Sequence, residues 1–339
     1  MKEDKEMKKG HLILTIMLII VMGLAAISCG PKENGKPSEP GQESSNGTES
    51  TSQSCSVGIV VKSLDNDYYT TLRNGAEKRA KEKGVDLTFV APNSETDVQG
   101  QVDMIANLIA AKVDVLAVCP SDDEATLPVI QEAGEAGIPV IAVDNDTSYD
   151  KKLTFIGTGN FEAALEGGKY CAEQVGKGAK AIMLRGPEGS SNHDQRRDGY
   201  IEALTKGGVE ILEIKDCACD ASTAMSAIED FSTFYDDIDL IICTNDTMAI
   251  GAQRAVETGN LDTLVFGFDG SLDVCKGTAE GKFLGTVAQD PYSMGVIAID
   301  AALDIVAGKK IEERIDSGCT VVTKENAQSF IDLLEEQSK

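Results

Sequence analysis

Polar side chains that could hold a small hydroxylated molecule recur just after the apolar, strand-like runs of this sequence. Runs such as GIVV, VIAV and LIIC are each followed by a carboxylate, an amide or a guanidinium. The members of this set are Asn66, Asp122, Asp144, Asn145, Asn160, Arg196, Asn245, Asp269 and Gln289. These groups supply fixed donors and acceptors, and the bidentate ones can bond two adjacent hydroxyls, which both donate and accept. The chemistry favours a polyhydroxylated ligand.

Two adjacent rings, Tyr68 and Tyr69, complete this inventory in a chain that has no tryptophan. They stand where the first helix is expected to begin. An aromatic face packs against the C–H face of a sugar ring, so we expect both tyrosines to face the ligand. Tyr69 also falls on the apolar stripe of the helix, and packing in the core is its alternative role.

Helix capping is the competing explanation for the polar set. Asn and Asp are common N-caps, and any one of them alone is better explained by capping than by ligand contact. Arg196 and Gln289 are not preferred caps, yet they stand at equivalent strand ends, Arg196 where the loop enters a helix. The set as a whole therefore indicates a binding site.

The elements that must position these residues follow a repeated strand and helix pattern from Ser56 onward. Short runs rich in Val, Ile and Leu alternate with stretches in which apolar residues recur at helical spacing. Continuous apolar strands separated by helices favour parallel sheets that are covered on both faces. Two such series predict an α/β fold with two doubly wound lobes, in which ligands bind beyond the carboxyl ends of the strands.

Composition excludes one class of partner. The 339 residues are 42% hydrophobic and 26% charged, with a formal net charge of -25. Such an acidic chain repels the phosphate backbone, because nucleic-acid binding depends on Lys and Arg that release counterions. We expect no nucleic acid partner.

The N-terminal region is typical of an exported protein. Lysines precede a short apolar run that ends in small residues, which predicts a signal peptide over residues 1–28. AISC, at residues 26–29, resembles the lipobox of bacterial lipoproteins, which implies a lipid on Cys29. Residues 29–55 are rich in Pro, Gly, Ser and Glu and predict a disordered tether. We expect a membrane-anchored protein outside the cytoplasm.

Cysteine and histidine usage disfavours a metal site or an enzyme. Nine cysteines are present, and those that close apolar runs are expected to be free, buried thiols. Cys217 and Cys219 lack the C-x-x-C spacing of zinc sites, and His193 is the only histidine after the leader. No nucleophile and base pair is recognisable, so we predict a binding protein without a cofactor.

Several segments together resemble the ribose-type periplasmic binding proteins, which are receptors of bacterial ABC sugar importers. They include IPVIAVDNDT, FIGTGNFEAALEGG, CTNDTMAIGAQRAV and TVAQDPYSMG, in one unbroken order. The resemblance implies two Rossmann-like lobes joined by a hinge of three crossings, near residues 157–159, 289–291 and 318. It places residues 56–158 and 290–318 in the N-terminal lobe, and residues 159–289 and 319–333 in the C-terminal lobe.

The resemblance also implies a set of ligand contacts. They are Asn66, Tyr68, Tyr69, Asp144, Asn145, Asn160, Arg196, Asn245, Asp269 and Gln289. Three residues depart from the pattern of the ribose receptors. Asp67 replaces a common Pro, Asn145 replaces a common Arg, and Cys219 replaces the residue from which many members stack a third ring. These departures put ribose itself in doubt.

We therefore expect a receptor that binds a pentose or hexose by hinge closure and delivers it, as a monomer, to an ABC permease. The alternative is a sugar or autoinducer co-receptor for a two-component system. Lys62 and His193 to Gln195 resemble the branch that binds a furanosyl autoinducer, although Thr244 and Asp246 do not fit it. A sugar-responsive repressor would need a DNA-reading helix-turn-helix where this chain has its leader and tether.

Overall fold

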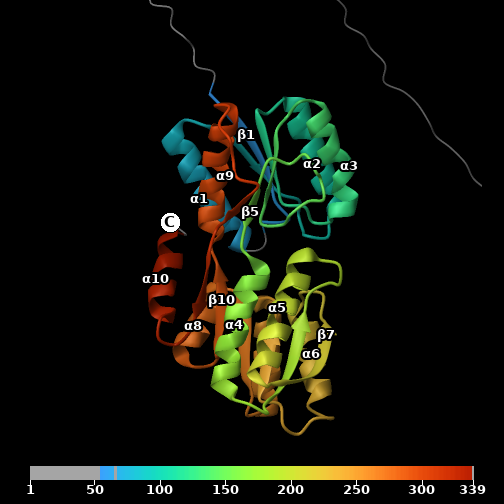
Figure 1. Ribbon diagram of the computed structural model, residues 1–339, viewed down its shortest axis with the longest axis vertical. Helices are drawn as coiled ribbons and strands as arrows, with labels where there is room; N and C mark the ends of the chain where they lie inside the picture. The colour runs from blue at the N-terminus through green and yellow to red at the C-terminus, as the bar shows by residue number, and fades with distance from the viewer. Residues whose placement is uncertain (1–53, 65–66, 338–339) are drawn as a thin grey trace, which may run out of the picture. The chain divides into compact units, whose positions relative to one another are not determined.

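The computed structural model describes residues 54–64 and 67–337 (Figure 1). The predicted signal peptide, Cys29 and nearly all of the predicted tether lie outside the described residues, as does Asn66. None of the described helices combines the length and the hydrophobicity needed to cross a bilayer.

The first sheet is entirely parallel and has the strand order β11-β5-β4-β3-β1-β2. Its strands are β1 (Ser56–Val60), β2 (Asp86–Val90), β3 (Val115–Val118), β4 (Val140–Val143), β5 (Phe155–Gly157) and β11 (Arg314–Asp316). The central strands β3 and β4 are buried along their whole length, as expected for a sheet that is covered on both faces.

Helices pack on both faces of this sheet and complete the first lobe. One face carries α1 (Asp67–Lys83) and α9 (Pro291–Val306), and the other carries α2 (Val98–Ala111) and α3 (Asp123–Glu135). Leu72 of α1 and Ile299 of α9 are fully buried on one side, and Ile105 of α2 is fully buried on the other. The apolar stripes of these helices therefore form two cores, one on each side of the sheet.

The second sheet has the order β12-β10-β9-β8-β6-β7 and is parallel except for β12, which pairs antiparallel with β10. Its strands are β6 (Lys180–Arg185), β7 (Glu210–Asp216), β8 (Leu240–Cys243), β9 (Leu264–Asp269), β10 (Gly285–Gln289) and β12 (Cys319–Val322). The fold class predicted from the sequence is confirmed, with one antiparallel edge strand added.

The second lobe is covered in the same way. Helices α4 (Asn160–Val175) and α5 (Ser191–Gly207) form one core with the sheet, and α6 (Ala221–Phe231) and α7 (Asp246–Gly259) form another. A smaller cluster joins α8 (Leu272–Glu280) to α10 (Ala327–Gln337). Each lobe is thus a doubly wound layer structure with its own apolar core.

The chain passes between the two sheets three times, as predicted. It crosses from β5 to α4, returns from β10 to α9, and crosses again between β11 and β12. Two of the crossings are bonded to each other, because the amide of Ser317 donates to the carbonyl of Gly157 at 3.2 Å and Arg314 donates to the carbonyl of Thr158 at 3.0 Å. The residue-level boundaries of the lobes stay a prediction.

The eight cysteines of the described residues are all free. The buried ones are Cys119, Cys171, Cys217, Cys243 and Cys275. Most of these thiols are buried, as predicted. Burial raises the pKa of the Cys171 and Cys243 thiols well above their usual value, so both behave as small apolar side chains. Within the described ranges, no group of three or more His, Cys, Asp or Glu could hold a metal ion.

Candidate functional site

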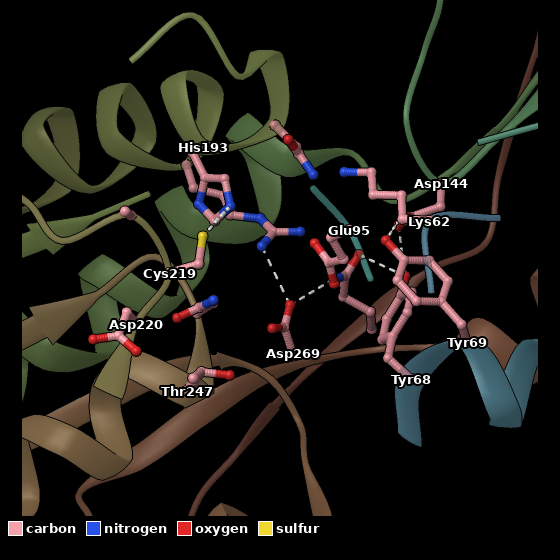
Figure 2. Close-up of a pocket in the computed structure, with 15 residues that line it drawn as sticks. Lys62, Tyr68, Tyr69, Glu95, Asp144, His193, Cys219, Asp220, Thr247 and Asp269 are labelled. Carbon is pink, nitrogen blue, oxygen red and sulfur yellow. Dashed lines mark hydrogen bonds and ion pairs between the residues drawn. The ribbon is translucent and has the colours of Figure 1, made fainter. Parts of the chain in front are cut away.

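A cavity of about 320 Å³ lies beyond the carboxyl ends of the strands and is lined by residues of both lobes (Figure 2). Its volume falls within the range of small-molecule sites. The predicted residues that line it are Tyr68, Tyr69, Asp144, Arg196, Asn245, Asp269 and Gln289. Asn145 and Asn160 line a smaller neighbouring cavity instead, and Asn66 is not described.

Asp144 holds the first-lobe side of the cavity. The hydroxyl of Tyr68 donates to its Oδ1 at 2.7 Å, and the hydroxyl of Tyr69 donates to its Oδ2 at 3.2 Å. Burial and then the negative charge of Asp144 raise the pKa of Tyr68 well above its usual value, so this phenol stays a donor. The carboxylate and the two hydroxyls form a rigid polar group that can face a ligand.

The two tyrosines differ in their surroundings, although their rings meet edge to face with centroids 5.2 Å apart. Tyr69 is only 4% exposed and belongs to the core between α1 and the sheet, while it also borders the cavity. Tyr68 is half-buried and lies close to Gln289, at 3.3 Å from hydroxyl to Oε1. Tyr69 therefore both packs in the core and lines the cavity.

Arg196 is the buried cation of the second-lobe side. It lies inside α5, in its second turn, and not at the helix entry where the sequence placed it. Its Nε donates to Oδ1 of Asn160 at 2.8 Å, and its Nη1 donates to the carbonyl of Thr244 at 3.0 Å and to Oδ1 of Asp269 at 3.2 Å. The guanidinium also lies over the ring of Phe268, 3.9 Å from its centroid. These contacts fix its orientation.

Asp269 and Gln289 connect the arginine to the tyrosines. The amide of Gln289 donates to Oδ1 of Asp269 at 2.7 Å, the same oxygen that accepts from Arg196. Burial raises the pKa of the Asp269 carboxyl, and the positive charge of Arg196 opposes the rise. With Tyr68 beside Gln289, a chain of polar contacts runs from Asp144 in one lobe to Arg196 in the other.

Two members of the polar set cap helices, and for one of them capping is the only role at this site. Asp122 caps α3 by accepting from the amide of Ala125 and does not line the cavity. Asn245 caps α7 by accepting from the amide of Met248 at 2.9 Å, and it lines the cavity as well. An N-cap after a strand can therefore also serve as a ligand contact, because both roles belong to the same end of the sheet.

Other lining residues were not in the predicted contact set. They are Lys62, Glu95, Asn192, His193, Ala218, Cys219, Asp220 and Thr247. Glu95 and Asp220 follow β2 and β7, which are edge strands of the two sheets. They stand five and four residues past their strands, no farther than Asn66 stands past β1, so distance along the loop does not explain why they were missed.

His193 and Cys219 form a polar pair on the opposite side of the cavity from the tyrosines (Figure 2). Thr244 Oγ1 accepts from the amide of Gly186 at 3.1 Å, so its own proton can be donated to Nδ1 of His193 at 2.8 Å. Nε2 is hydrogen-bonded to the sulfur of Cys219 at 3.2 Å, and the neutral ring donates one of these two bonds and accepts the other. Burial first, and the charge of Arg196 second, lower the pKa of His193 well below its usual value and keep the ring neutral.

Backbone strain is concentrated at the cavity. Six described residues other than glycine have positive φ, and two of these, Lys112 and Asn260, are helix C-caps. The others all line the cavity, and they are Asp144, Ala218, Cys219 and Asp269, with φ of 65°, 50°, 58° and 122°. Such conformations cost about 1–3 kcal/mol each and cluster at functional sites. The fold tolerates this strain where it aims side chains into the cavity.

Comparison with known proteins places this geometry in a known context. The model of the periplasmic binding protein domain family matches residues 57–310. The ribose import binding protein RbsB of Bacillus subtilis is 29% identical over 94% of this chain and 100% of its own length. The RbsB protein of Haemophilus influenzae is 29% identical over 81% of this chain and 94% of its own length. A periplasmic solute binding protein from Actinobacillus succinogenes, solved with bound D-allose, is 30% identical, with a TM-score of 0.77 over 81% of this chain and 99% of that one.

Proposed function

Because the chain belongs to the periplasmic binding protein family, we propose that it is the substrate-binding protein of an ABC importer and binds a monosaccharide of the pentose or hexose class. The observation that carries the proposal is the composition of the cavity. Carboxylates, amides, a guanidinium and two tyrosines from both lobes surround a space of about 320 Å³. Such a set matches the adjacent hydroxyls and the C–H faces of a sugar ring.

The number of available bonds favours moderate affinity. A sugar that made six to eight hydrogen bonds, each worth about 1 kcal/mol and nearer 2 with charged partners, would recover more than association and side-chain ordering cost. A surplus of about 8 kcal/mol corresponds to a Kd of about 1 μM. This range suits a receptor that must both capture and release its ligand.

Closure of the two lobes supplies the mechanism. Asp144 belongs to one lobe and Arg196 to the other, so only a closed arrangement gives a sugar its full set of bonds. The ligand then shifts the population toward the closed state in proportion to its stronger binding there. A permease would recognise the closed surface, and a lipid on Cys29, which lies outside the described residues, would keep the receptor near the membrane.

A thermal-shift screen of the exported chain tests this function. The panel contains pentoses, hexoses, polyols and the furanosyl autoinducer. A ligand that binds only the folded state at 100 times its Kd adds about 2.7 kcal/mol to the free energy of unfolding, so at least one monosaccharide should raise the melting temperature by several degrees. The proposal fails if no monosaccharide of the panel shifts the melting temperature.

The second candidate function is recognition of a furanosyl autoinducer, or of a sugar, by a co-receptor for a sensor kinase. It is favoured by one observation, namely that Lys62 and His193 line the same cavity as the sugar-type residues. Transport and sensing use the same closure. The autoinducer in the panel separates the ligands, and permease genes or a sensor kinase gene beside this one separate the two roles.

A further inference from the structure

Asp246 is a buried acidic residue that does not border the cavity. It is the first residue of α7, directly after Asn245, and its exposure is only 2%. It forms no ion pair with any described residue, and burial first and the charge of Asp269 second raise the pKa of its carboxyl. A buried carboxylate without a cation is costly, so its two oxygens need strong hydrogen bonds.

Both oxygens of Asp246 accept short hydrogen bonds. Oδ2 accepts from the backbone amide of Ser271 at 2.6 Å, and Oδ1 accepts from the hydroxyl of Thr286 at 2.7 Å. Hydrogen bonds to an ionised acceptor are shorter and stronger than those between neutral groups. Ser271 follows β9, and Thr286 belongs to β10. One carboxylate therefore joins the two strands whose last residues are Asp269 and Gln289.

The turn that Asp246 binds has a strained backbone. Asp269 has a φ of 122° and Gly270 a φ of 76°. A residue other than glycine keeps such a φ only where its surroundings hold it there. The amide of Gly270 also donates to Oγ1 of Thr286 at 3.4 Å, which ties the same turn to β10. These contacts hold the conformation from which the Asp269 side chain borders the cavity.

Helix stability is the competing explanation for Asp246. A carboxylate in the first turn of a helix interacts favourably with the helix dipole, whatever its oxygens bind. The dipole alone does not account for the bonds to Ser271 and Thr286. The backbone amide of Asp246 also acts on the carboxyl of Asp269 and lowers its pKa, so the main chain and the side chain of Asp246 both bear on the Asp269 turn.

We propose that Asp246 is a positioning residue of the binding site, which holds the turn of residues 269–271 so that the Asp269 carboxylate meets both Arg196 and the ligand. This inference rests on the proposed function and adds to it a residue that does not touch the ligand. Asp246 then affects sugar affinity through Asp269. A residue that merely stabilised the second lobe would affect affinity equally with and without the Asp269 side chain.

A double-mutant cycle, measured by calorimetric titration of the best-binding sugar, tests this dependence. Asp246→Asn keeps the side-chain shape but removes the charge and one of the two acceptors, so it should weaken binding by about fivefold or more. With Asp269→Ala already in place, the same change should alter the Kd by less than about twofold. The matched control is Asp122→Asn, which changes a capping carboxylate of α3 away from the cavity and should bind sugar as the wild type does.

Thr286→Val tests the same link from β10 and replaces Asp246→Asn if that variant does not fold. The valine keeps the branched shape and both carboxylates, but it removes the donor to Oδ1 of Asp246. It should weaken binding by about threefold or more alone, and by less than about twofold in the presence of Asp269→Ala. Thermal unfolding of each variant shows that the protein used for titration is folded.

The outcomes separate this inference from the proposed function. Binding of no sugar by the wild type overturns both. Sugar binding that neither Asp246→Asn nor Thr286→Val weakens overturns the inference alone. Losses of equal size with and without the Asp269 side chain also overturn it, because they show that Asp246 acts on the stability of the lobe. Losses that disappear in the presence of Asp269→Ala support it.

Discussion

Tyr68 combines an aromatic face with a hydroxyl that is fixed by Asp144. We predict that Tyr68→Ala weakens sugar binding by ~1–3 kcal/mol, because the stacking surface is lost. Tyr68→Phe keeps the ring and removes one hydrogen bond, so its loss should be about 1 kcal/mol. Titration with the best-binding sugar measures both. Equal losses in the two variants would show that the ring makes no separate contribution.

Arg196 is expected to affect binding and stability together. Arg196→Ala should weaken sugar binding more than tenfold, and it should also lower the melting temperature of the ligand-free protein. The second effect follows from the 3% exposure of Arg196, since its removal leaves the partly buried Asp269 without its cation. The control is Arg197→Ala, which removes only ion pairs with Asp194 and Asp198 at the surface of the same helix. If Arg196→Ala behaved like Arg197→Ala in both assays, the assignment of Arg196 to the binding site would be contradicted.

His193 should contribute to the pH dependence of stability. Its pKa in the folded protein is lowered, mainly by burial, below the value of about 6.5 for an exposed histidine. The unfolded chain therefore binds the proton first, and the contribution of His193 to the free energy of unfolding is present above about pH 6.5 and lost as the pH falls.

Melting curves at several pH values check this. His193→Gln should lose less stability than wild type between pH 7.5 and 5.5. Asp246 and Asp269 have pKa values raised mainly by burial, which gives a slope of the opposite sign, but both are present in each protein and do not affect the difference. Identical pH profiles for the two proteins would rule out a buried neutral His193.

At the scale of residues, the sequence predicted many of the side chains that line the cavity. Asp144, Asn245, Asp269 and Gln289 were found because polar residues that follow parallel strands share one edge of a sheet. Glu95 and Asp220 were missed because β2 and β7 are edge strands of exposed and half-buried residues, so the polar residues that follow them contrast less with the strand. The ligand contact expected for Asn145 stays a prediction, and this residue lines the smaller neighbouring cavity.

At the scale of elements, α1 and α9 lie side by side on the first sheet with their backbones in contact (Figure 1). A Cβ on Gly295 would lie 2.1 Å from the carbonyl oxygen of Leu72, and a Cβ on Gly75 would lie 2.1 Å from that of Tyr292. These glycines permit the close packing. Because α1 also carries Tyr68 and Tyr69, the contact fixes one wall of the cavity.

Gly295→Ala should therefore destabilise the protein by about 1–3 kcal/mol, because the added methyl group pushes two backbones apart. Chemical denaturation measures the change. Gly259→Ala is the matched control, because its Cβ would meet the flexible side chain of Leu261, at 3.2 Å, at the exposed C-terminal end of α7. A loss no larger than that of the control would mean that the two helices separate at little cost.

The order of elements was predicted well, and the exceptions have a physical reason. Buried strands such as β3 and β4 are continuous apolar runs that the sequence displays clearly. Strands β11 and β12 lie at sheet edges, are mostly exposed and lack an apolar run, so no strand was predicted there. The antiparallel pairing of β12 with β10 follows from the third crossing, which brings the chain back beside the last parallel strand.

At the scale of the whole molecule, two lobes joined by three crossings allow closure around a ligand. We predict that saturating sugar reduces the radius of gyration measured by small-angle X-ray scattering, because the closed state is more compact. A sugar that does not bind serves as the control. An unchanged radius at saturation would mean that binding does not shift the population toward a closed state.

The most direct test of a sugar held by both lobes is calorimetric titration of the best-binding sugar into the wild type and two single variants. Asp144→Asn changes the first lobe and Asp269→Asn the second, and each replaces a carboxylate that borders the cavity. Loss of a charged acceptor should weaken binding more than tenfold in each variant. Wild-type affinity in either variant would contradict a site shared between the lobes.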